Sequence, residues 1–363
     1  MRVHFVNENI GGHVTMHRHV EEALARHTDV EATFWDVPRD VFLARAFGSS
    51  WPGLSRLDLD LHLVRTRLAQ SELVRRHLAE LAPLPDVLHL YTQNTGWLST
   101  KTMRRVGTVV SIDASNNQNA YLLPHRRPTR FTPLTVAAGR RWETRVFAAA
   151  RAIVAHSQWA ADAVIASGVP ADRMHIVPFG ISVRDVVTAA RDDGPPRIAF
   201  VGLSMERKGG WRLLDLWRRT LRDVSRLVLV TPEHVPPGEG LEVHNDVRQG
   251  DGKLERILAS ADVFVMPGDV DTFGYSILEA MAMGLPVVVP RLAAIPEIVD
   301  DGVSGLVVPA GDDYALTTAL RRLVLDRAER CAMGEAARQR VREQFDARVT
   351  TDALVEILRD AAA

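Results

Sequence analysis

The sequence predicts an α/β protein with two successive doubly wound domains, each a parallel sheet covered by helices. Short apolar runs, typical of buried parallel strands, alternate with longer segments of helical character. The alternation is broken once, by the acidic, glycine- and proline-containing stretch RDDGPPR at 191–197, and then starts again. The 363 residues, 46% of them hydrophobic, are enough for two domains with cores of their own. We therefore expect one domain at 1–190 and a second at 191–345.

The first domain begins with the pattern of a strand, a loop and a helix. Val3–Val6 is an apolar run, Asn7–Gly12 is polar and contains a glycine pair, and Val14–Arg26 has helical character. Further apolar runs separated by helical segments indicate parallel strands. They are Val87–Leu90, Val109–Ile112 and Ile153–Ala155.

The second domain repeats the pattern. Its apolar runs are Ile198–Val201, Leu227–Val230 and Val263–Met266. A glycine-bearing loop ending at Gly210 follows the first run, and a proline- and glycine-rich loop at 231–240 follows the second. Beyond Pro309, the sequence predicts helices over Asp312–Arg327, Ala328–Gln344 and Thr351–Ala361.

Composition excludes several classes of function. The formal net charge is −1 with a pI near 6.9, so the molecule has no basic footprint for nucleic acid. Cys331 is the only cysteine, which excludes intrachain disulfides and multi-cysteine metal sites. The N-terminus lacks the pattern of a secretory signal, and no apolar run is long enough to span a membrane. We expect a cytoplasmic protein.

The most informative stretch is DVDTFGYSILEAMAMGLPVVVP at 269–290. It predicts an acidic loop after a strand, a helix that starts near Gly274, and a stop at Gly284 and Pro286. Glu279 is the only charged residue from Tyr275 to Val289. A carboxylate in so apolar a helix is costly unless hydrogen bonds reach it, and paired ligand hydroxyls could supply them. The alternative is that Glu279 favours an early helical turn and pairs with a neighbouring arginine.

The start of the same helix predicts an anion site. The amides around Gly274, Tyr275 and Ser276 and the positive end of the helix dipole suit a phosphate. Asp271 lies just before the helix, where it could bind a ligand or cap the helix. Together, Asp271 and Glu279 favour a ligand site over either structural role.

A second candidate is VGLSMERKGG at 201–210, which follows a predicted strand and precedes a predicted helix. Gly202, Arg207 and Lys208 then lie at the carboxyl end of that strand, where ligands bind in such sheets. Lysine is rare in this chain, at positions 101, 208 and 253 only, which adds weight to Lys208. An ordinary exposed basic loop is the alternative.

The first domain offers weaker candidates. The Gly11-Gly12 pair lies in the first strand-to-helix loop, where glycine permits close approach of the backbone to a ligand, although a plain turn explains it as well. Asp113 ends a predicted strand at its carboxyl end, where ligand-facing residues occur. His89 could face a ligand too, but we favour a structural polar role for it.

An arginine-rich stretch lies at 124–151. It holds arginines 126, 127, 130, 140, 141, 145 and 151 against one acid, Glu143. Such a face could meet an anionic acceptor or the inner face of a membrane, or could be only a solvated surface, which we favour.

Taken together, these segments resemble the retaining GT-B glycosyltransferases of family 4, which contains sucrose synthases and bacterial mannosyltransferases. The segment from Asp271 to Glu279 resembles the E-x7-E element of that family, and VGLSMERKGG resembles its phosphate-binding lysine loop. IPEIVDDGVSGLVVP at 295–309 resembles the segment that follows, and 154–181 resembles the end of the first domain. The resemblance implies two Rossmann-like domains facing a central cleft, with a last helix at about 346–363 packed back on the first domain.

The resemblance also implies roles for single residues. Glu279 would bind the nucleotide ribose, Asp271 would face the donor sugar, and Lys208 with Arg207 would stabilise the diphosphate. The implied donor contacts are Gly12, Gly202, Arg207, Lys208, Asp271, Phe273, Gly274, Tyr275, Ser276 and Glu279, and the implied acceptor contacts are Gly11, His13 and His89. The donor would be a UDP or GDP sugar, the acceptor a small molecule, a lipid-linked sugar or a glycan, and no metal or other cofactor is expected.

Three positions depart from the family pattern. Asp271 stands where the family commonly has glutamate, which shortens the reach to the sugar by one methylene. Leu203 stands where many members carry an arginine, and Asp113 stands where many have a histidine near the reacting sugar. Asp113 is therefore a candidate catalytic residue beside Asp271 and Lys208. Leu203 and Asp113 motivate one rival, a sugar-nucleotide-binding regulatory protein without catalysis. The other rival is a phosphorylase or epimerase acting at a similar two-domain cleft, for which the sequence carries no marker.

Overall fold

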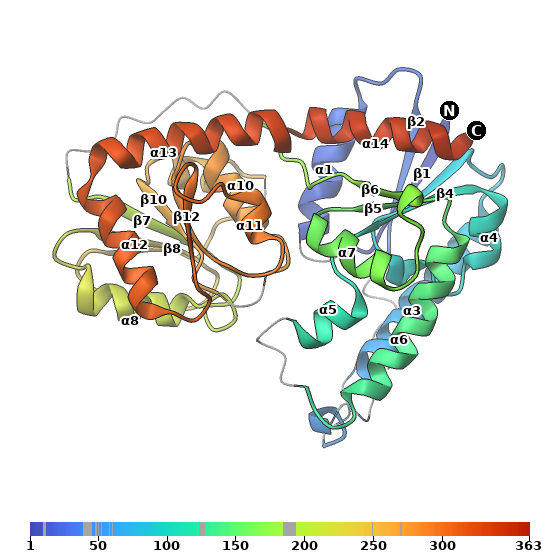
Figure 1. Ribbon diagram of the computed structural model, residues 1–363, viewed down its shortest axis with the longest axis horizontal. Helices are drawn as coiled ribbons and strands as arrows, with labels where there is room; N and C mark the ends of the chain where they lie inside the picture. The colour runs from blue at the N-terminus through green and yellow to red at the C-terminus, as the bar shows by residue number, and fades with distance from the viewer. Residues whose placement is uncertain are drawn as a thin grey trace. The chain divides into compact units, whose positions relative to one another are not determined.

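The computed structural model describes residues 1–9, 12–38, 46–47, 49, 51, 53–57, 59, 61–122, 128–183, 194–248, 250–268 and 271–363. These residues form two compact units, each with its own sheet (Figure 1). The first unit comprises residues 1–122, 128–182 and 347–363, and the second comprises 183–346. Residues 191–193 of the linker RDDGPPR lie outside the described residues, and its last residue, Arg197, is the first of β7. No helix among those described is long and apolar enough to cross a membrane.

The sheet of the first unit has six parallel strands in the order β2-β1-β3-β4-β5-β6. The strands are β1 (Arg2–Asn7), β2 (Glu31–Asp36), β3 (Val87–Leu90), β4 (Gly107–Ile112), β5 (Ala152–Ala155) and β6 (Met174–Ile176). The inner strands β3 and β5 are buried at every position, which explains their continuous apolar runs.

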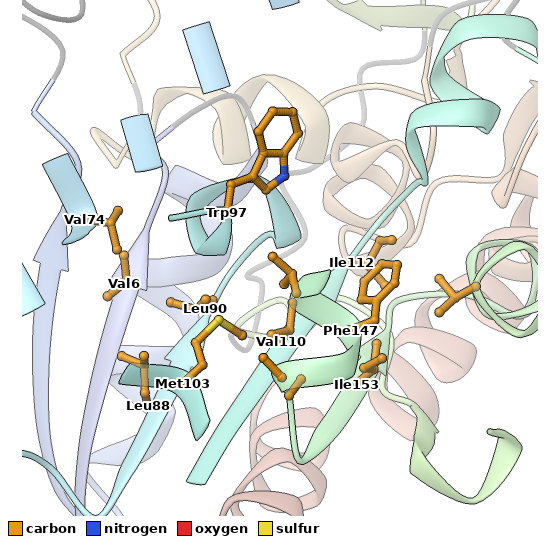
Figure 2. Packing of buried hydrophobic residues seen from close by; sticks show 14 of the residues in the cluster. Val6, Val74, Leu88, Leu90, Trp97, Met103, Val110, Ile112, Phe147 and Ile153 are labelled. Atoms are coloured by element: carbon orange, nitrogen blue, oxygen red, sulfur yellow. The ribbon is translucent and has the colours of Figure 1, made fainter. Parts of the chain in front are cut away.

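Helices cover both faces of this sheet. They are α1 (Gly12–Leu24), α3 (His62–Glu80), α4 (Thr100–Arg105), α5 (Asn116–Tyr121), α6 (Thr132–Ala149), α7 (Gln158–Ala166) and α14 (Ala347–Ala362). Short 3₁₀ turns lie at η1 (Ser55–Leu57), η2 (Gln93–Gly96) and η3 (Ala171–Arg173). The last helix, α14, packs against α1, β3 and β4. Figure 2 shows the core of the unit, where Leu90, Met103, Val110 and Phe147 pack between sheet and helices.

The sheet of the second unit also has six parallel strands, in the order β12-β11-β10-β7-β8-β9. The strands are β7 (Arg197–Val201), β8 (Arg226–Val230), β9 (Leu241–His244), β10 (Val263–Val265), β11 (Val287–Pro290) and β12 (Gly305–Val308). The helices are α8 (Gly210–Thr220), α9 (Lys253–Ala259), α10 (Tyr275–Ala282), α11 (Ile295–Ile298), α12 (Asp313–Leu325) and α13 (Arg327–Arg340). A π-helical turn, η4 (Val341–Phe345), follows α13 and contacts α10.

The α/β fold class is confirmed, with two parallel sheets and the alternation of strand and helix that the apolar runs predict. Five strands were not predicted: β11 and β12, which follow the helix of the most informative stretch, and β2, β6 and β9. The last three lie at edges of the two sheets. Their side chains are mostly half-exposed rather than buried, so they lack the continuous apolar run that marks an inner strand.

Candidate functional site

The strand order of the second unit reverses between β7 and β10. From β7 the chain proceeds outward through β8 and β9, and it then returns to place β10 on the other side of β7. In open parallel sheets, ligands bind beyond the carboxyl ends of the strands at such a reversal. The loop after β7 carries Lys208, and the loop after β10 leads to Asp271.

These two loops touch through their backbones. Gly209, the residue just before α8, has a φ of 75°, and a Cβ added there would lie 3.2 Å from the Cα of Gly268. A Cβ added at Gly268 would lie 2.6 Å from the carbonyl oxygen of Lys208, closer than a real Cβ comes to any atom. Glycine is therefore required at Gly268 for the loops to approach this closely.

Lys208 and Asp271 form an ion pair between Nζ and Oδ1. Both side chains are largely buried, with 17% and 18% of their surface exposed. The other carboxylate oxygen of Asp271, Oδ2, is buried and has no hydrogen-bond partner among the described residues. Because a buried acceptor without a donor is costly, this oxygen can accept a hydrogen bond from a ligand hydroxyl.

Helix α10 begins immediately after this pair. The residue at its N-cap position, Gly274, has a φ of 88° and, being glycine, has no side chain to cap the first amides of the helix. A Cβ at Gly274 would lie 2.7 Å from Cδ1 of Ile277, so this tight entry to the helix favours glycine. The positive end of the helix dipole thus lies next to the two charged side chains, where it attracts an anion.

The polar residues of α10 lie along one face. Tyr275, Ser276 and Glu279 are half-buried, whereas Ile277 and Leu278 are completely buried. Since Glu279 follows Tyr275 by four residues and Ser276 by three, the three side chains share a helix surface. The expected burial of most of this helix is confirmed.

The remaining residues proposed for donor binding differ in their surroundings. Gly202 is buried, and a Cβ there would lie 2.8 Å from Cζ of Phe200. Arg207 is exposed on the same loop, and so is Leu203, with 77% of its surface accessible. Phe273 is 5% exposed and packs edge-on against Phe345, with 6.4 Å between ring centroids. Its ring therefore anchors the loop between Asp271 and Gly274 in the core.

In the first unit, the strand order reverses between β1 and β3, and a second polar cluster lies at the carboxyl ends of the strands. His13, in the first turn of α1, is 5% exposed, and its Nδ1 lies 2.9 Å from Oε1 of Glu8. Burial lowers the pKa of His13, but the Glu8 carboxylate and the charge of Asp113 outweigh it, so the pKa lies above its ordinary value. Gly12, the first residue of α1, is exposed, and Gly11 lies outside the described residues.

Asp113 follows β4 directly and is half-buried. The sequence interpretation missed its neighbour His156, which follows β5 in the same way. Nδ1 of His156 donates to the carbonyl of Val177 at 2.8 Å, and the ring stacks on Phe179 at 3.9 Å. Burial lowers the pKa of His156 to about 4, so the ring is neutral and its Nε2 is an acceptor that has no partner among the described residues. The signal was available, since His156 and Asp113 both follow an apolar run.

His89 lies inside the sheet of the first unit. It is completely buried, and its Nε2 lies 2.9 Å from Oγ of Ser111. Burial lowers the pKa of His89 to about 3, which keeps the ring neutral. Because no part of the side chain reaches the surface, these surroundings favour the structural role and do not support an acceptor contact.

Comparison with known proteins identifies the family. Residues 11–180 match the model of a "Glycosyl transferase 4-like domain", and residues 195–326 match the model "Glycosyl transferases group 1". The chain belongs to the GT-B glycosyltransferases of family 4. The two matches fall on the two units, and the second contains the Lys208 loop and α10.

Curated relatives of this GT-B chain match over part of their length. A GDP-mannose-dependent alpha-mannosyltransferase of Mycobacterium tuberculosis is 29% identical over 67% of the chain and 65% of that protein. A D-inositol 3-phosphate glycosyltransferase of Saccharomonospora viridis is 41% identical over 32% of the chain and 26% of that protein. The chain thus spans less than two thirds of the length of these relatives.

Solved GT-B structures match over nearly the whole chain. Sucrose-phosphate synthase from Thermosynechococcus elongatus is similar with a TM-score of 0.75 and 17% identity, covering 99% of this chain and 98% of that one. The HepE protein of Anabaena in complex with UDP-glucose is similar with a TM-score of 0.68 and 15% identity, covering 99% and 100%. At these identities the likeness establishes the fold.

Proposed function

We propose that this GT-B chain transfers a hexose or a related sugar from UDP or GDP to an acceptor, with retention of the anomeric configuration. The observation that carries the proposal is the buried Lys208–Asp271 pair at the start of α10, with one carboxylate oxygen left without a partner among the described residues. A relative named as a GDP-mannose-dependent mannosyltransferase, and a fold neighbour solved with UDP-glucose, support a sugar nucleotide as donor.

The second unit supplies the donor site in this proposal. Glu279 accepts hydrogen bonds from the ribose hydroxyls, and Oδ2 of Asp271 accepts one from a hydroxyl of the sugar. Lys208, Arg207 and the amides at 274–276 stabilise the negative charge that grows on the diphosphate as its bond to the anomeric carbon breaks. The ammonium group of Lys208 then interacts with both the Asp271 carboxylate and the diphosphate.

The donor is used without a metal ion in this proposal, because a lysine, an arginine and a helix N-terminus supply the positive charge beside the leaving group. Transfer should therefore proceed at the same rate after treatment with EDTA, and loss of activity that Mg²⁺ or Mn²⁺ restores would contradict this part.

The first unit supplies the acceptor side. Asp113 is the candidate for a contact with the reacting sugar, and the neighbouring Glu8–His13 pair and neutral His156 offer acceptors and donors for sugar hydroxyls. The acceptor is a small molecule, a lipid-linked sugar or a glycan.

Turnover with a panel of sugar nucleotides tests the proposal. The purified chain is incubated with UDP- and GDP-linked hexoses, and release of the nucleoside diphosphate is followed with and without candidate acceptors. We expect release from at least one donor by the wild type and strong loss of release in Asp271→Asn. Tight nucleotide binding without turnover of any donor would instead indicate a regulatory protein.

A further inference from the structure

Large apolar side chains lie exposed in the segment between β2 and α3. In a soluble protein, exposed apolar residues are usually scattered, and a group of them marks an interaction site. Here six occur within fifteen positions, each between 40% and 49% exposed, and they are Phe47, Trp51, Leu54, Leu57, Leu59 and Leu61.

A distant part of the chain adds to this group. Oγ1 of Thr129 donates to the carbonyl of Leu57 at 3.0 Å, which brings the η1 turn next to the start of α6. Leu134, in the first turn of α6, is 63% exposed. Figure 1 shows the short blue segment of η1 beside the lower end of α6. We call the six residues and Leu134 the apolar tip.

The tip is held in place by an arginine. The guanidinium of Arg65 lies 4.2 Å from the centre of the Trp51 ring and also donates to the carbonyl of Ser49 at 2.9 Å. This contact orients the indole on the surface. Trp51 is therefore presented to a partner beside a positive charge.

Exposed arginines extend from the tip along α6. Arg130, just before the helix, and Arg141 and Arg145 within it are exposed. The last two follow Leu134 by seven and eleven residues, which places them on its face of the helix. The one acid of the helix, Glu143, is 5% exposed and accepts hydrogen bonds from Gln93 and from the backbone of Asn116. It therefore does not neutralise this surface. Arg151 faces elsewhere, since it donates to the carbonyl of Ala361.

We propose that the apolar tip inserts into the surface of a membrane that contains anionic lipids, with the arginines of α6 at the headgroups. Leucines and a tryptophan at the end of the unit, with arginines behind them, match the interfacial region, where apolar side chains enter the acyl boundary and cations meet phosphate. A protein partner would need an acidic surface for the arginines next to an apolar surface for the leucines. An anionic bilayer offers headgroup phosphates and acyl chains together. This membrane contact does not depend on the proposed transfer reaction.

Vesicle flotation tests the apolar part of the proposal. The full chain is mixed with vesicles of phosphatidylcholine, with or without phosphatidylglycerol, at low salt. We expect binding only to the vesicles with phosphatidylglycerol, and a loss of about tenfold or more in the double variant Leu54→Ser, Leu57→Ser. The control variant Tyr314→Ser, Leu325→Ser removes side chains that are 82% and 60% exposed in the second unit and should bind as the wild type does.

Charge variants test the proposed contact between the arginines of α6 and the lipid headgroups. Arg141→Gln with Arg145→Gln should weaken binding and flatten its dependence on salt, because screening then acts on fewer ion pairs. Three results would overturn the proposal: no binding at low salt, binding that the leucine variant leaves unchanged, or a wild-type dimer that this variant converts to monomer in light scattering. Nucleotide-induced thermal shifts should be equal in all variants, which separates failure here from failure of the donor site.

Discussion

Lys208 and Asp271 join the loops that follow two neighbouring strands of the second unit, through an ion pair that leaves Oδ2 of Asp271 buried without a partner among the described residues. The pair brings a cation suited to a diphosphate and an acceptor suited to a sugar hydroxyl to the start of α10. In the proposed reaction the two residues therefore act on different parts of one donor, and substitutions should separate their effects.

Asp271→Asn should reduce sugar transfer by about 100-fold or more, with a much smaller effect on binding of the free nucleoside diphosphate. The amide keeps the shape of the side chain but loses the charge that acts at the reacting sugar. Lys208→Met should reduce sugar transfer and also weaken binding of the free nucleoside diphosphate, because the lysine faces the diphosphate in the free nucleotide and in the donor. Steady-state kinetics and calorimetric titration measure the two effects, and equal losses of binding in both variants would contradict the separate roles.

Gly268→Ala should weaken donor binding. The added methyl group would lie 2.6 Å from the backbone oxygen of Lys208, so the two loops must move apart. The matched control is Gly238→Ala, where the nearest atoms would lie 3.9 Å away, an ordinary contact. Calorimetric titration with UDP and GDP compares the two variants. Equal affinities would show that the close approach of the loops is not needed for the site.

Phe345→Leu should raise the KM for the donor more than it changes kcat. Phe345 packs on Phe273, which lies between Asp271 and Gly274, so a smaller side chain loosens the loop without touching the ligand. Val324→Ala, a buried change in α12, serves as a control for lost stability alone. If both variants raise KM equally, the aromatic contact has no specific role in positioning the loop.

Stability should fall as the pH drops from about 6.5 to 4, in part through His4. Burial and the neighbouring His77 lower the pKa of His4 to about 4 from the ordinary 6.5. Nε2 of His4 lies 2.9 Å from Nε2 of His77, so the two rings share one hydrogen bond only while at least one is neutral. Between these pH values the unfolded chain binds more protons than the folded one, and stability is lost as the pH falls.

Chemical denaturation at pH 7.5 and pH 5 measures this loss. His4→Gln should reduce the dependence of the unfolding free energy on pH, by up to about 1.4 kcal/mol per pH unit within the window. His234→Gln, a change at an exposed histidine of the second unit, is the control for removal of a histidine as such. An unaltered slope in His4→Gln would contradict the assignment.

All inner strands but β11 could be predicted, because burial on both faces demands an uninterrupted apolar run. Val87–Leu90 is a strand with the predicted bounds, and the strand predicted at Val263–Met266 ends one residue earlier. Edge strands such as β9 escaped prediction, since its sequence LEVH mixes polar and apolar residues on a half-exposed edge. Such a pattern does not differ from that of a loop.

The candidate site was only partly predictable. Lys208 and Asp271 were each visible in their own motifs, but their contact depends on the placement of β10 beside β7, which no local pattern encodes. The inward orientation of Phe273 depends in the same way on a partner 72 positions further along the chain, Phe345. The position of His156 after an apolar run was visible, but a single histidine there is common, and only the fold reveals an Nε2 without a partner among the described residues.

The most direct test of the donor site is a thermal-shift titration of the wild type and Glu279→Ala with UDP, GDP and their glucose and mannose conjugates. A ligand that binds only the folded protein raises its melting temperature with concentration. We predict such a rise for one nucleotide series in the wild type, displaced to at least tenfold higher concentration in Glu279→Ala. No rise with any nucleotide, or the same rise in both proteins, would contradict the assignment of α10 as the sugar-nucleotide site.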